Sequence, residues 1–196
     1  MKEKMQIGFY FDQSRCIGCY ACVAACRSWN ELDQEMPDMI EIVSKERGEF
    51  PDVSLTHLFL TCFHCDQPAC IPACPDELLV KRAEDGIVVI TDSEQCTNCG
   101  LCVEACPYGV PKMVTNGSTV KIVKCNLCLD RIGEGKAPVC VDTCPTEALD
   151  AGPMDELRAK YGETKDLEGF HNPSETSPSI IFRAMTLKKQ DLSQAS

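Results

Sequence analysis

Sixteen cysteines set the chemistry that this sequence can perform, and they fall into four groups of four. Every group opens with the spacing C-x2-C and closes with the spacing C-x3-C. Thiolates in such repeated patterns are ligands for soft metal centres. The groups are, in order, Cys16, Cys19, Cys22 and Cys26; Cys62, Cys65, Cys70 and Cys74; Cys96, Cys99, Cys102 and Cys106; and Cys125, Cys128, Cys140 and Cys144.

Three chemistries use many cysteines, and the spacing separates them. Disulfides need an oxidising compartment and side chains that meet in pairs, and a repeated four-cysteine spacing is not their pattern. Zinc ribbons use C-x2-C pairs, but the tight triplets of the first and third groups do not suit separated zinc knuckles. The third group, "CTNCGLCVEACP", matches the run C-x2-C-x2-C-x3-C-P that holds iron–sulfur clusters. We therefore expect four 4Fe–4S clusters, because four thiolates hold each one.

The fourth cysteine of each group is expected to bind a neighbouring cluster. Three closely spaced thiolates on a loop can cap three corners of a cube-shaped cluster. The next cysteine lies about one helical turn further along the chain and is displaced from that cube. In two-cluster bacterial ferredoxins the fourth cysteine does bind the other cluster. Cys26 is therefore predicted to serve a second cluster.

Proline follows the last cysteine in three of the four groups, at Pro75, Pro107 and Pro145. Proline has no backbone N–H and does not continue a helix, so it turns the chain at the cluster. Arg27 follows Cys26 instead. We therefore expect residues 20–32 to continue as a helix.

The segments between the groups predict an α+β fold of two bacterial-ferredoxin-like modules, made of short helices and β-hairpins around paired clusters. Alternation in "LLVKR" and "GIVVI" on either side of "EDG" predicts one hairpin. Asn116-Gly117 between β-prone stretches predicts another. Residues 31–56 are polar and are expected to be a connecting insertion loop. The stretch "GPMDELRAKYG" is expected to form a short helix.

These elements divide the chain into two modules and a tail. Residues 57–114 would form one module from groups two and three. Residues 1–56 and 115–152 would form the other from groups one and four, although groups three and four are also close enough in sequence to pair. Residues 153–196 would form a C-terminal helix and a loop-like extension that contacts a partner, with one apolar stretch at residues 180–182.

The charge balance argues against nucleic acid as a partner. The formal net charge is -11, from 30 acidic and 19 basic residues, whereas binding a phosphate backbone needs clustered Lys and Arg. Four clusters of about -2 each would take the charge to roughly -19. We therefore expect nearby cations, such as Arg15, Lys124 and Arg131, to adjust the cluster potentials.

The sequence predicts neither a membrane span nor an export signal of its own. It has no apolar run of about 18 residues, no apolar signal-peptide core before Cys16 and no twin-arginine pair.

Catalysis by this chain is not expected. No Ser, His and Asp set or carboxylate pair is evident, and the histidines, His57, His64 and His171, are scattered. His64, between two cysteines, is expected to pack or to form a hydrogen bond rather than to bind metal. A cluster closed by four thiolates has no open position for substrate and passes single electrons. The predicted function is therefore electron conduction.

Several motifs together resemble the iron–sulfur subunit of the dimethyl sulfoxide reductase family of molybdopterin oxidoreductases. They are "CFHCDQPAC", the x11 gap of "CNLCLDRIGEGKAPVC", "GIVVI", "ACPYGVP" and "CPTEALDAGPMDELRAKYG". The resemblance covers roughly residues 7–165. It implies a catalytic partner that carries molybdenum or tungsten bis-molybdopterin and an integral membrane anchor that handles quinone.

The resemblance also implies which cysteines share a cluster. Cluster 1, expected nearest the catalytic subunit, would take Cys16, Cys19, Cys22 and Cys144; cluster 2 would take Cys125, Cys128, Cys140 and Cys26; cluster 3 would take Cys62, Cys65, Cys70 and Cys106; and cluster 4, expected nearest the quinone, would take Cys96, Cys99, Cys102 and Cys74. Relatives among nitrate reductases have Trp in group three and a three-iron centre. Cys99 stands at that place here, so a complete 4Fe–4S cluster is expected.

The resulting expectation is a non-catalytic subunit of an anaerobic respiratory oxidoreductase, which conducts electrons between the molybdopterin subunit and the membrane anchor. Such a complex would lie peripherally at a membrane, on the exported face by way of a partner's twin-arginine signal rather than on the cytoplasmic face. The alternative is an electron-transfer subunit of a soluble formate dehydrogenase or hydrogenase, or a free polyferredoxin. The sequence does not select the terminal substrate or the direction of electron flow.

Overall fold

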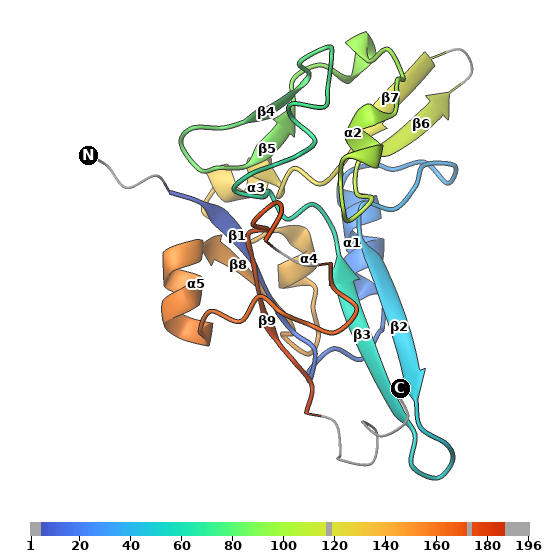
Figure 1. Cartoon of the computed structure of the whole chain (residues 1–196), viewed down its shortest axis with the longest axis vertical. Helices are drawn as coiled ribbons and strands as arrows, with labels where there is room; N and C mark the ends of the chain where they lie inside the picture. The colour runs from blue at the N-terminus through green and yellow to red at the C-terminus, as the bar shows by residue number, and fades with distance from the viewer. Residues whose placement is uncertain (1–4, 117–118, 172–173, 187–196) are drawn as a thin grey trace.

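The computed structural model describes residues 5–116, 119–171 and 174–186 (Figure 1). Helices and strands are mixed, which confirms the α+β class. The strands are β1 (Ile7–Asp12), β2 (Glu41–Arg47), β3 (Ser54–Leu60), β4 (Leu79–Lys81), β5 (Val88–Ile90), β6 (Lys112–Asn116), β7 (Thr119–Val123), β8 (Leu149–Pro153) and β9 (Ile180–Arg183). The helices are α1 (Ala21–Trp29), α2 (Leu101–Glu104), α3 (Leu129–Gly133), α4 (Val139–Asp142) and α5 (Met154–Tyr161), with a 3-10 turn, η1 (Ser93–Gln95).

Strand β1 is the centre of a three-stranded sheet in the order β8-β1-β9. It runs antiparallel to β8 and parallel to β9, so that Phe9 lies opposite Ala151 on one side and Ile180 on the other. All six residues of β1 are buried, because the two sides of the sheet are both covered. Tyr10 stacks on Tyr161 of α5, with 3.6 Å between the ring centroids.

The opposite face of β1 packs on β3. Phe59 of β3 lies 5.8 Å from Phe9 and 5.9 Å from Phe11 between ring centroids, and all three side chains are at most 1% exposed. Cys26, Cys125 and Cys140 belong to the same buried core. The cysteines therefore share this core with large apolar side chains of β1, β3 and β9.

Replacing Phe59 by alanine should lower the free energy of unfolding by about 3–5 kcal/mol, because a large buried side chain leaves a cavity. Urea unfolding of the cluster-loaded chain, followed by circular dichroism under anaerobic conditions, measures the loss. Leu55→Ala is the matched control, because Leu55 lies on the same strand and is 50% exposed. It should change stability by less than about 0.5 kcal/mol. Equal losses in the two variants would contradict the packing described here.

The segment expected to be an insertion loop contains a long hairpin instead. Strands β2 and β3 pair antiparallel from Glu41↔Leu60 to Arg47↔Ser54, and Figure 1 shows the hairpin projecting away from the sheet that contains β1. The prediction failed because the outer half of β2 is charged and exposed. Lys45 and Arg47 of that half both form ion pairs with Glu168, which is distant in sequence.

The two expected hairpins are present. Strands β4 and β5 pair from Leu79↔Ile90 to Lys81↔Val88. Strands β6 and β7 pair as well, although residues 117–118 of their expected Asn-Gly turn lie outside the described residues. Figure 1 shows both hairpins with α2 at the end of the molecule opposite the tip of the β2–β3 hairpin.

The expected C-terminal helix is α5. The apolar stretch after it, expected to be part of a loop-like extension that contacts a partner, is a strand instead. Ile180, Ile181 and Phe182 form most of β9, and each is at most 1% exposed. They complete the sheet because β1 has a free edge that an apolar strand can cover. Residues 187–196, the rest of the predicted extension, lie outside the described residues.

No helix within the described ranges is long and apolar enough to cross a bilayer.

Candidate iron–sulfur sites

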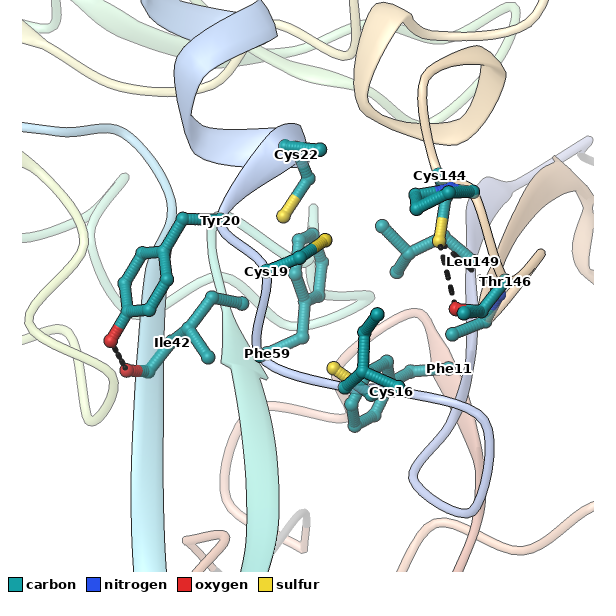
Figure 2. Close-up of a pocket in the computed structure, with 15 residues that line it drawn as sticks. Phe11, Cys16, Cys19, Tyr20, Cys22, Ile42, Phe59, Cys144, Thr146 and Leu149 are labelled. Carbon is teal, nitrogen blue, oxygen red and sulfur yellow. Dashed lines mark hydrogen bonds between the residues drawn. The ribbon is translucent and has the colours of Figure 1, made fainter.

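None of the sixteen cysteines, all of which lie in the described residues, forms a disulfide. Figure 2 shows the surroundings of four of them, Cys16, Cys19, Cys22 and Cys144, whose sulfur atoms face one space. Three of these come from the β1–α1 loop and the first turn of α1, and Cys144 comes from the loop between α4 and β8. The space lined by these residues and by apolar side chains has an unfilled volume of about 360 Å³, part of it open to solvent.

The pKa values of two of these thiols, Cys16 and Cys22, are raised first by burial and then by the neighbouring thiols. Burial raises the pKa of Cys22 to about 11. A hydrogen bond from the backbone N–H of Val23 lowers this pKa, and the neighbouring Cys16 and Cys144 raise it. Burial also raises the pKa of Cys16, followed by smaller contributions from Cys144 and Cys19. The structure therefore brings Cys144 next to thiols that lie more than a hundred residues away in sequence.

Cys26 approaches a different set of thiols. Burial raises its pKa to about 12, and the next contributions come from Cys125 and Cys128. Cys140 is also buried, and its pKa lies well above the usual value because of burial and then because of Cys125, Cys128 and Cys26. Helix α1 packs against α4, which carries Cys140, and this contact brings the two groups together.

The remaining thiols meet within groups two and three. Burial raises the pKa of Cys65 to about 11 and that of Cys70 to about 12, and Cys62 and Cys106 raise both further. Cys102 has a raised pKa because of burial and then because of Cys74, Cys96 and Cys99. Each of these two sets thus combines three thiols of one group with one of the other.

One backbone feature recurs in all four groups. The residue directly before the second cysteine has a left-handed conformation in every case: Gly18 at φ 63°, His64 at φ 45°, Asn98 at φ 60° and Leu127 at φ 61°. Such a residue makes successive N–H groups converge on one side of the loop, where they form a concave site for an anion. The N–H of Leu127 accordingly donates to Cys125 Sγ at 3.3 Å. This geometry suits a negatively charged cluster.

At Gly18 a neighbouring side chain excludes a Cβ atom. A Cβ at this position would lie 2.4 Å from Cε1 of His57. His57 is itself buried, and its Nδ1 lies 2.9 Å from Ser44 Oγ on β2. The β2–β3 hairpin therefore packs against the first cysteine loop through His57.

The prolines after groups two, three and four do turn the chain. The residue two positions after each proline has a positive φ, and its N–H donates to the carbonyl of the preceding cysteine: Glu77 to Cys74 at 3.2 Å, Gly109 to Cys106 at 3.0 Å and Glu147 to Cys144 at 3.1 Å. No such turn follows Cys26. The N–H of Asn30 donates to its carbonyl at 3.1 Å and caps α1, so the predicted helix is confirmed, with its end at Trp29.

Three polar side chains outside the cysteine spacing patterns also contact the thiols, and of these only Thr176 is distant in sequence from every group. Asn30 Nδ2 donates to Cys26 Sγ at 3.6 Å, Thr146 Oγ1 lies 3.7 Å from Cys144 Sγ, and a hydrogen bond from Thr176 lowers the pKa of Cys65. We did not predict these three residues. Asn and Thr are frequent throughout loops, and their types alone give no signal for such a role.

His64 forms a hydrogen bond, as expected. It is 0% exposed, and its Nδ1 accepts a hydrogen bond from the N–H of Val88 at 3.0 Å. Burial lowers its pKa well below 6.5, and the nearby Lys124 lowers it further. The imidazole is therefore neutral at physiological pH and adds no charge to the site.

Of the three cations expected near the clusters, two have acidic partners; the Arg15 side chain is 49% exposed, whereas that of Arg131 is 13% exposed. Arg15 pairs with Glu147 at 3.1 Å. Arg131 pairs with Asp142 and lies 4.8 Å above the ring of Trp29. Lys124, in contrast, is only 5% exposed.

The thiol sets suit a cluster better than a single ion. Within the described residues, no three Cys, His, Asp or Glu side chains converge closely enough to hold one metal ion. The thiols of Cys16, Cys19, Cys22 and Cys144 instead line one space, and the donor atoms of every set are sulfur. That donor set and the converging N–H groups fit an iron–sulfur cluster, whose irons are held by separate thiolates.

Comparisons with known proteins agree with this chemistry. Residues 53–154 match a family model described as a 4Fe-4S dicluster domain, and residues 9–28 match one described as a 4Fe-4S binding domain. Over 186 residues the chain is 38% identical to the B subunit of anaerobic dimethyl sulfoxide reductase from Escherichia coli K12, covering 91% of this chain and 88% of that protein.

Two further relatives extend the comparison. The protein of the same name from Haemophilus influenzae is 34% identical over 187 residues, which cover 91% of this chain and 89% of the relative. Protein NrfC of Escherichia coli K12 is 37% identical over 160 residues, which cover 81% of this chain and 70% of the relative. The chain therefore belongs to the family of iron–sulfur electron-transfer subunits that includes the B subunit of anaerobic dimethyl sulfoxide reductase, and it is a non-catalytic subunit of that type.

Proposed function

We propose that the chain is a wire of four 4Fe–4S clusters between a catalytic subunit with molybdenum or tungsten bis-molybdopterin and a quinone-reactive subunit in the membrane. Each cluster, when bound, supplies one-electron transfer. The ligand sets are those implied by the family resemblance, and the two modules are those that pair groups one with four and two with three. The mutual effects of the thiols on their pKa values support these sets.

The observation that carries this proposal is the exposure of the cysteines. Two of the sixteen are exposed, Cys19 and Cys99, and they belong to the proposed sets at opposite ends of the wire. The proposed second set, in contrast, consists entirely of buried cysteines: Cys26, Cys125, Cys128 and Cys140. A wire needs access for partners at its ends and shielding from solvent between them.

Neighbouring sets are linked along the same order. Cys22 and Cys26 lie one turn apart on α1 and join the first two sets. Cys62 is the thiol that most raises the pKa of Cys125, after burial, and joins the second set to the third. Groups two and three exchange their last cysteines and join the third set to the fourth.

The exposed ends carry apolar side chains that suit partner subunits. Ile17 and Tyr20 flank Cys19 and are 62% and 51% exposed, and Leu101 lies near Cys99 and is 46% exposed. The first end would receive the molybdopterin subunit and the second the membrane anchor. The relatives' name, which denotes the B subunit of a reductase, supports membership of a complex of several chains. We place this complex peripherally at the membrane, on the exported face.

Purification of the tagged chain from its native host under anaerobic conditions tests the proposal. We expect about sixteen irons per chain, together with a large molybdenum or tungsten subunit and a hydrophobic subunit. Ile17→Glu should weaken binding of the large subunit by tenfold or more, or about 1.4 kcal/mol, and leave the hydrophobic subunit bound. Leu101→Glu should have the reverse effect. A soluble chain with its clusters but without either partner would favour a free polyferredoxin instead.

A further inference from the structure

Lys124 is the sole buried lysine or arginine among the residues that the structure describes, with 5% of its surface exposed. Burying an ammonium group is costly unless hydrogen bonds and opposite charges compensate it. Its Nζ donates to the carbonyl of Cys125 at 2.8 Å and to the carbonyl of Val88 on β5. Two neutral carbonyls do not balance a buried charge, so the site requires an anion nearby.

The surroundings of Lys124 include thiols of two different sets. It directly precedes Cys125 of the proposed second set. Burial raises the pKa of Cys70, in the proposed third set, and Lys124 lowers it by a smaller amount. Lys124 therefore lies where the two middle sets approach each other, at the junction of the two modules.

Strand β5 fixes both the cation and the neighbouring cysteine loop. The carbonyl of Val88 accepts from Lys124, while the N–H of the same residue donates to His64 between Cys62 and Cys65. His64 is neutral, so the positive charge at this place is that of Lys124. The next cation, Lys81, donates to the carbonyl of Cys65 at 2.7 Å but lies 3.4 Å from the carboxylate of Asp66, which offsets its charge.

We propose that Lys124 is the positioning cation that raises the reduction potentials of the two middle clusters. A cluster held by four thiolates is negatively charged and becomes more negative when it accepts one electron from its neighbour, which is oxidised. A buried positive charge stabilises the reduced form more than the oxidised one, and low polarity strengthens the effect. This inference rests on the proposed ligand sets.

Redox titration of the complete chain, monitored by electron paramagnetic resonance, tests the role of Lys124. Lys124→Met keeps the length of the side chain but removes its charge. Two of the midpoint potentials should fall by at least 59 mV, which is tenfold in the equilibrium constant of a one-electron couple. Lys124→Arg should restore them. Arg15→Gln removes a cation that is exposed and paired with Glu147 and should shift the potentials less.

Iron content separates the possible failures. Wild-type chain without four clusters would refute the proposed function. Lys124→Met with four clusters and unchanged potentials would overturn only the role of Lys124. If Lys124→Met does not assemble its clusters, Lys124→Gln provides the second measurement, because it keeps a hydrogen-bond donor and lacks the charge. Unchanged potentials in that variant would likewise overturn the inference.

Discussion

The double variant Cys26→Ala with Cys140→Ala should lose one 4Fe–4S cluster, whereas Cys26→Ala with Cys22→Ala should lose two. Cys26 and Cys22 are neighbours in sequence, yet the structure places Cys26 among the thiols of group four. Counting the intact four-iron clusters by iron content and by spin integration should give about three for the first pair and about two for the second. The single variant Cys26→Ala should retain about three.

A matched pair at the other site repeats the comparison in reverse. Cys144→Ala with Cys22→Ala should remove one cluster, because the two thiols line the same space and are proposed to bind the same cluster. Cys144→Ala with Cys140→Ala should cost two, although these residues are again neighbours in sequence. If sequence neighbours behave as one site in both pairs, each group binds its own cluster and the exchange of ligands is wrong.

The chemistry of the sites could be predicted from sequence because ligand spacing is a local property. Three thiols within a short loop and a proline after the fourth are visible in the letters themselves, and the turns at Glu77, Gly109 and Glu147 follow from them. The left-handed residues were only partly visible. Gly18 and Asn98 are typical of that conformation, whereas His64 and Leu127 adopt it under the control of the surrounding structure.

The three-stranded sheet and the β2–β3 hairpin could not be predicted from sequence, because their strands depend on contacts with residues that are distant in sequence. Residues 180–183 form a strand because β1 lies beside them, and nothing within the stretch itself specifies this. The charged residues of β2 do not show the alternation that predicts a strand. Lys45 and Arg47 instead form ion pairs with Glu168. The cations illustrate the same limit: sequence position suggested Arg15, Lys124 and Arg131 equally, and only the structure distinguishes the buried one.

The iron-free chain should unfold as the pH rises from 7.5 to 10, whereas the cluster-loaded chain should not. Burial raises the pKa of Cys26 and Cys70 from 9.0 to about 12, and that of Cys22, Cys65 and Cys125 to about 11, with neighbouring thiols adding to each rise. Below pH 9 these thiols are protonated in both folded and unfolded chains, so they do not oppose folding. Above pH 9 the unfolded chain loses their protons first, and stability falls until the pH passes the folded pKa values.

At pH 10, about one unit above the unfolded value, each such thiol should favour unfolding by roughly 1 kcal/mol. Five of them together approach the whole stability of an ordinary domain, which is about 5–15 kcal/mol. Urea unfolding of the iron-free chain at both pH values, under argon with a reductant, measures the effect. An equal urea midpoint at pH 7.5 and pH 10 would show that the thiols are not buried together as described. The loaded chain is the control: its thiolates are already bound to iron, and the same burial that disfavours free thiolates then strengthens their attraction to the metal.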